Sequence, residues 1–109
     1  MAFPLEISER ETLELIRGGN PPLIVDVRDA RSYAAGHIPG AISVPMDGFD
    51  VRKIAAMAAP DAQIIVSCYR GQASKSVVNY LRQNGYENAQ SMAGGWSGWQ
   101  RIPGAPVEK

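Results

Sequence analysis

The residue in this sequence with the clearest capacity for chemistry is Cys68, its only cysteine. It stands between an apolar segment, residues 63–67, and a polar stretch that contains Gly71 and leads into a predicted helix. Backbone N–H groups at the start of a helix stabilise a thiolate, and nearby cations such as Arg70 and Lys75 add to this effect. The pattern therefore predicts a nucleophilic thiolate. Position alone leaves one alternative, an inert thiol buried at the end of a core strand.

Composition limits the other kinds of site. With one cysteine and one histidine, the chain has no internal disulfide, no Cys-x-x-Cys pair and no zinc site built from these ligands, so we expect neither metal nor cofactor. Eleven basic and eleven acidic residues give zero net charge with no concentrated basic face, which argues against nucleic-acid binding. No apolar run could cross a bilayer and the first residues do not resemble a signal peptide, so we expect a cytoplasmic protein without a membrane partner. No visible motif encodes an oligomer, so we expect a monomer.

Strands are predicted to alternate with helices along the chain. Apolar, β-branched segments predict strands at residues 23–27, 40–45, 63–67 and 89–92. Helical spacing predicts a first helix capped by Ser8 and ending at Gly18, then helices at residues 29–35, 50–59, 74–84 and 95–100. This order indicates an α/β fold, with a mainly parallel central sheet flanked by helices on both faces. We expect one domain over residues 1–109, with a core of about residues 7–101 and a tail at residues 102–109.

The predicted sheet brings polar residues to the same edge as Cys68. Ligands of open α/β folds bind beyond the carboxyl ends of the strands. Asp26 and Arg28 lie at the carboxyl end of the strand at residues 23–27, so they should share that edge. We expect the two to support the site by pairing with each other or with backbone near the loop, and Arg28 to add positive potential.

Three segments of the sequence resemble the rhodanese family of sulfurtransferases. They are residues 23–41, which end in Gly-His-Ile-Pro-Gly-Ala, the loop at residues 68–74, and residues 92–99, which contain Gly-Gly-Trp-Ser-Gly-Trp. The resemblance covers about residues 7–101. It implies a rhodanese-like three-layer fold in a single domain, similar to the short thiosulfate sulfurtransferases of bacteria.

The resemblance also implies a reaction. In the family, the cysteine thiolate takes the outer sulfur of a donor such as thiosulfate and holds it as a persulfide. The persulfide then passes its sulfur to cyanide or to a thiol acceptor, including thiol proteins such as thioredoxin. Carried over to this chain, Cys68 holds the persulfide and Arg70 steers the anionic donor. The substrate-binding residues are then Tyr69, Arg70, Gly71, Gln72, Ala73 and Ser74.

Two other functions stay open at this point. The same loop could serve a sulfur carrier or interaction module, which receives a persulfide from a partner protein without turning over thiosulfate. Phosphatases and arsenate reductases share the fold, but their longer loop carries an arginine at the sixth position after the cysteine. This sequence has Ser74 there, so we expect the loop to fit a smaller sulfur-centred group than a phosphoester.

Other conspicuous residues have structural explanations. His37, the only histidine, is expected to hydrogen-bond to backbone rather than to act in catalysis. Trp96 and Trp99 are spaced to dock the last helix on the sheet. Tyr69 is expected either to lie at the mouth of the pocket or to pack over the loop.

Overall fold

The computed structural model describes residues 2–109 and contains a five-stranded sheet in which every pair of neighbouring strands is parallel. The strands are β1 (Glu6–Ile7), β2 (Leu23–Asp26), β3 (Ile42–Ser43), β4 (Ile64–Ser67) and β5 (Ala89–Met92), in the spatial order β1-β5-β4-β2-β3. The helices are α1 (Glu9–Arg17), α2 (Ala30–Ala35), α3 (Val51–Ala55), α4 (Ala73–Gln83) and α5 (Gly95–Gln100). The predicted α/β fold is confirmed.

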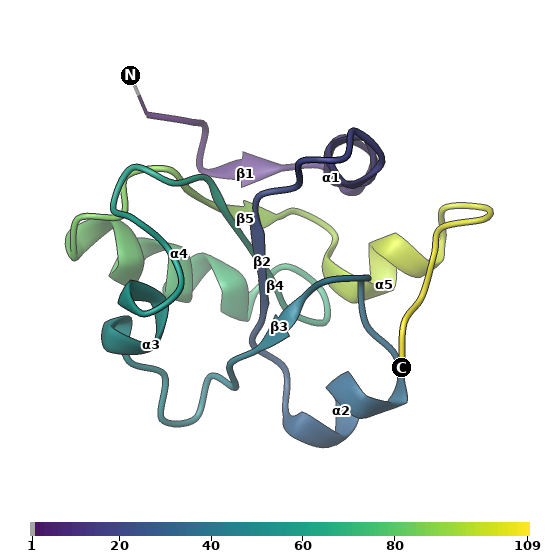
Figure 1. The fold of residues 1–109 in the computed structure, drawn as a ribbon. Helices are drawn as coiled ribbons and strands as arrows, with labels where there is room; N and C mark the ends of the chain where they lie inside the picture. Colours follow the sequence, from purple (N-terminus) through teal and green to yellow (C-terminus); the bar gives the residue numbers. More distant parts are fainter. Residues whose placement is uncertain (1) are drawn as a thin grey trace.

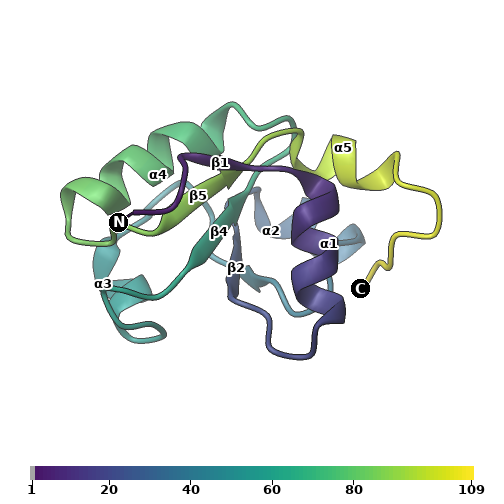
Figure 2. The same cartoon turned by 90° about the horizontal axis from the view of Figure 1, so that it is seen from above.

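The sheet forms the middle of three layers (Figure 1). Side chains on a strand alternate between its two faces. In β4, Ile64 and Val66 pack in a cluster with residues of α3 and α4, whereas Ile65 packs in the opposite cluster with residues of α1 and α5. Figure 2 shows α4 and α1 on either side of the strands. Helices therefore cover both faces, as the sequence predicts.

Helix α1 begins where its sequence indicates. The Ser8 hydroxyl accepts a hydrogen bond from the Glu11 N–H at 3.1 Å, and the Glu11 carboxylate accepts one from the Ser8 N–H at 3.4 Å. This capping box satisfies backbone donors that the first turn leaves unpaired. Helix α3 is shorter than the predicted 50–59, because the chain turns at residues 56–57 instead of continuing the helix.

Strand β1 is the element that the sequence pattern did not reveal. It has two residues, Glu6 and Ile7, which pair with Ser91 and Met92 of β5. Two residues are too few to show an alternating pattern, so only the pairing with β5 defines the strand. Because β1 runs parallel to β5, α1 starts at the same edge of the sheet as Cys68.

The segment expected to form a tail, residues 102–109, lies against the domain. Its backbone pairs with His37 through Glu108, with N–H to carbonyl distances of 2.9 Å in both directions. The indole N–H of Trp99 donates to the carbonyl of Pro106 at 2.9 Å. Trp96 and Trp99 of α5 are both buried and pack in the cluster that includes Ile65 of the sheet, which confirms their predicted docking role.

Candidate active site

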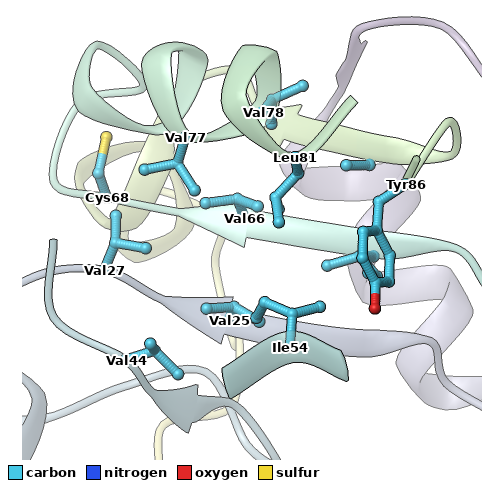
Figure 3. Packing of buried hydrophobic residues seen from close by; sticks show 12 residues of the cluster. Val25, Val27, Val44, Ile54, Val66, Cys68, Val77, Val78, Leu81 and Tyr86 are labelled. Carbon is cyan, nitrogen blue, oxygen red and sulfur yellow. The ribbon is translucent and has the colours of Figure 1, made fainter. Parts of the chain in front are cut away.

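Cys68 directly follows β4, at the carboxyl edge of the sheet. Figure 3 shows its sulfur turned toward the loop before α4 and away from the labelled valine side chains. The residue is 4% exposed, so burial alone would favour the inert thiol. However, the Gly71 N–H donates to Sγ at 3.1 Å, and the Ser74 hydroxyl lies 3.4 Å from Sγ. Cys68 therefore lies at the end of an apolar cluster, but its sulfur is surrounded by hydrogen-bonding groups.

These donors change the acidity of Cys68. Burial raises the pKa of the thiol, because it disfavours the charged form. Hydrogen bonds from the Ser74 hydroxyl and from the backbone N–H groups of Ser74, Gly71 and Arg70 together outweigh burial, so the net pKa of Cys68 is lowered. The thiolate is therefore populated at a lower pH than in an ordinary cysteine, which is the property a sulfur nucleophile needs.

A second serine extends this network. The Ser74 hydroxyl lies 2.7 Å from the hydroxyl of Ser91, which comes from β5, and both residues are buried. When Ser74 donates its hydrogen to a Cys68 thiolate, its oxygen is free to accept the hydrogen of Ser91. Ser91 thereby orients the donor that contacts sulfur. No local motif marks Ser91, because it meets Ser74 only where α4 packs against β5.

We predict that Ser74→Ala slows alkylation of Cys68 by iodoacetamide about tenfold at neutral pH, because one hydrogen bond to a charged group is lost. The pH at which the alkylation rate is half-maximal should move upward, since the lowered pKa of Cys68 depends on this hydroxyl. Ser91→Ala should shift this half-maximal pH less, because Ser91 contacts Ser74 and not Sγ. Ser76→Ala, an exposed serine of the same helix, is the matched control. An unchanged pH profile in Ser74→Ala would contradict this account of the thiolate.

Helix α5 fixes the shape of the loop. The carbonyl of Cys68 accepts a hydrogen bond from the Trp96 N–H at 2.8 Å, and that of Tyr69 accepts one from the Ser97 N–H at 2.9 Å. These two bonds hold the carbonyl groups toward α5, while the backbone N–H groups of Arg70, Gly71 and Ser74 remain available to Sγ. The contact is close, because a Cβ at Gly95 would lie 2.6 Å from the carbonyl oxygen of Cys68. Only glycine permits this approach.

The geometry and the sequence together match a known family. The family model of the rhodanese-like domain covers residues 8–102. The chain belongs to the rhodanese family. Two similar curated relatives are the thiosulfate sulfurtransferase GlpE of Pseudoalteromonas translucida, 37% identical over the full length of both chains, and that of Haemophilus influenzae strain PittEE, 38% identical over 88% of each chain.

Solved structures of similar proteins agree with this fold. The rhodanese-like domain of an Anabaena protein is 28% identical and superposes with a TM-score of 0.85, over 97% of this chain and 80% of the other. A protein of Staphylococcus saprophyticus is 32% identical with a TM-score of 0.79, over 97% of this chain and all of the other. The predicted rhodanese-like three-layer fold is confirmed.

Asp26 ends β2, the strand next to β4, and Arg28 follows two residues later. The Arg28 guanidinium donates to Asp26 at 2.7 Å and to the carbonyl of Gly36 at 2.7 Å, and it stacks 4.8 Å from the ring of Trp96. The predicted pairing of the two residues is confirmed. Asp26 balances the charge of Arg28, so the main effect of the pair is to tie the segment after β2 to α5. A contribution of Arg28 to the potential at sulfur stays a prediction.

The remaining predicted loop residues differ in exposure. Tyr69 is 51% exposed, with its ring 5.4 Å from the Arg70 guanidinium. It therefore lies at the outer side of the loop and does not cover Cys68. Gln72 is exposed and Ala73 is half-buried, and neither side chain hydrogen-bonds to sulfur within residues 2–109. The backbone N–H groups that bond to Sγ are those of Arg70, Gly71 and Ser74.

His37 has a structural position in the rhodanese domain. Its ring stacks on Tyr33 with centroids 3.7 Å apart, and Nδ1 lies 2.7 Å from the Tyr33 carbonyl oxygen. Among the residues that the structure describes, no group of three or more His, Cys, Asp or Glu side chains could hold a metal ion. No helix in this range is long and apolar enough to cross a membrane.

Proposed function

We propose that this protein is a sulfurtransferase, which moves sulfane sulfur from thiosulfate to cyanide or a thiol through a persulfide on Cys68. The observation that carries the proposal is the cradle of N–H and O–H donors around a single buried cysteine, which lowers the pKa of its thiol. The curated relatives, which are named thiosulfate sulfurtransferases, support the choice of donor.

The first step forms the persulfide. The Cys68 thiolate attacks the outer sulfur of thiosulfate, a new Sγ–S bond forms, and the S–S bond of thiosulfate breaks. The electron pair of that bond leaves with sulfite, so charge and atoms balance without an oxidant or a cofactor. The loop N–H groups of Arg70, Gly71 and Ser74 are suited to this step, because negative charge stays near Sγ throughout.

The second step returns Cys68 to its thiolate. A cyanide ion or a thiolate attacks the outer sulfur of the persulfide, and the Sγ–S bond breaks with its electron pair on Sγ. We keep a thiol protein such as thioredoxin as a candidate acceptor, because the exposed side chains of Tyr69 and Arg70 leave the rim of the loop accessible. We assign the reaction to the cytoplasm, where a lone thiol stays reduced, and to a monomer, because one chain supplies every donor to sulfur.

The decisive experiment measures the mass of the intact protein. Incubation with thiosulfate should add one sulfur atom on the peptide that contains Cys68, and cyanide should then remove it with release of thiocyanate. Persulfide formation from a partner protein but not from thiosulfate would favour the carrier function instead. Hydrolysis of an aryl phosphate would favour a phosphatase. That chemistry fits poorly, because the position of the phosphate-binding arginine is occupied by Ser74, which contacts Sγ.

We predict that Arg70→Ala raises the apparent KM for thiosulfate about fivefold, because an exposed cation attracts the dianion with about 1 kcal/mol. The KM for a thiol acceptor that has no other charged group should change less than about twofold, since it brings only the single charge of its thiolate and not that of a dianion. Arg17→Ala, an exposed arginine at the far end of α1, is the control for the change in net charge. Equal effects on both substrates would count against a steering role for Arg70.

A further inference from the structure

A cleft lies beside the active loop, at the carboxyl edge of β1 and β5, and encloses about 680 Å³. Three arginines line it: Arg10 in the first turn of α1, Arg70 in the loop, and Arg101 directly after α5. We call it the arginine cleft. These residues lie far apart in the sequence, and the pairing of β1 with β5 brings the first of them to the loop.

The arginine cleft carries excess positive charge. All three arginines are exposed, and none forms an ion pair within residues 2–109. The one carboxylate in the lining belongs to Glu9, which already accepts a hydrogen bond from the Gly94 N–H at 2.5 Å. Three guanidinium groups against one carboxylate leave two positive charges unbalanced. Guanidinium groups bind carboxylates well, because two N–H donors match the two oxygens.

The size of the arginine cleft exceeds what thiosulfate needs. Thiosulfate has five heavy atoms, whereas clefts of about 300–1,000 Å³ hold ligands of several functional groups. Arg70 joins the cleft to the reaction, because its N–H faces Cys68 and its side chain lines the cleft. A ligand held by Arg10 and Arg101 could therefore present a sulfur atom at the loop.

We propose that the arginine cleft binds the carboxylates of a small thiol acceptor and so selects polycarboxylate thiols in the second half-reaction. This inference rests on the proposed sulfurtransferase function and names its acceptor class. The acceptor thiolate attacks the outer sulfur of the Cys68 persulfide, forms a new S–S bond, and leaves the electron pair of the broken bond on Sγ. The carboxylates take no part in bond making; they hold the acceptor in position.

The test compares acceptors that differ in charge. Mercaptoethanol, mercaptopropionate and mercaptosuccinate carry zero, one and two carboxylates, and each is measured per concentration of its thiolate. We expect the apparent KM to fall about threefold with each added carboxylate, and this trend to weaken at high salt. Equal KM values for the three thiols in the wild-type protein would overturn the proposal.

Variants locate the effect. The double variant Arg10→Gln/Arg101→Gln should lose most of the carboxylate trend, whereas Arg17→Gln, an exposed arginine at the other end of α1, should retain it. Retention of the full trend in the double variant would overturn the cleft as the binding site. Calorimetric titration with succinate, with its neutral diamide as control, tests the cleft without sulfur transfer. If no persulfide forms, but the wild-type protein binds succinate and the double variant does not, the cleft is upheld as a carboxylate site and the proposed function is contradicted.

Discussion

Replacing Cys68 with alanine should abolish transfer of sulfur from thiosulfate to cyanide. No other side chain in the chain can form a persulfide, because Cys68 is its only cysteine. Loss of a covalent nucleophile removes the reaction path itself, so we expect thiocyanate release to fall by about 10³-fold or more, to the uncatalysed background. The intact mass should not change when thiosulfate is added.

The fold should survive this substitution. Cys68 packs at the end of the cluster that includes Val66 and Val77, and alanine removes only its sulfur atom from that cluster. The cost should be about 1 kcal/mol, well within the stability of an ordinary domain. Circular dichroism and thermal unfolding check this. Thiocyanate release by Cys68→Ala above the background would show that the reaction does not pass through a cysteine persulfide.

The second large effect is expected for Gly71→Ala. Gly71 has a φ of +83°, in the left-handed region that side chains disfavour, and its N–H donates to Cys68. A Cβ at this position would lie 2.0 Å from the carbonyl oxygen of Ala93, so the loop or β5 must move. The segment after β5 cannot shift freely, because the Ala93 N–H is bound to Ile7 of β1 at 2.9 Å.

We therefore expect Gly71→Ala to destabilise the domain by about 2–4 kcal/mol and to reduce the reactivity of the thiol at neutral pH. Denaturant unfolding and alkylation across pH measure the two effects. Gly85→Ala is the matched control, because Gly85 has a φ of +93° but no atom within 4 Å of the added Cβ. It should cost about 1 kcal/mol and leave the thiol unaffected. Equal destabilisation in both variants would contradict the predicted clash.

Local sequence patterns were sufficient for most of the fold. Strands β2 and β4 contain apolar, β-branched runs, so their composition alone indicated them. The capping box at Ser8 and the glycines after the helices located the ends of α1 and α4. Strand β1 escaped notice because its stability comes from β5, more than eighty residues away, and not from any preference of its own two residues.

The same distinction applies to the site. Cys68 and its loop were predictable, because strand, cysteine and helix start are consecutive in the sequence. Ser91 was not, since it reaches Ser74 only through the packing of α4 on β5. Arg10 was not predictable either, because only the pairing of β1 with β5 brings it to the same cleft as Arg70. Residues that only the tertiary fold brings together have no characteristic spacing in the sequence, so no local pattern predicts them.

The anchoring of the Cys68 and Tyr69 carbonyls by Trp96 and Ser97 has a consequence for biosynthesis. A nascent chain still held by the ribosome before α5 has emerged contains the cysteine but lacks the amides that bend the loop around it. During that interval the acidity of the thiol resembles that of a cysteine in a free peptide, so it reacts poorly with sulfur donors. Reactivity is acquired last, when the carboxyl-terminal helix closes on a loop made many residues earlier.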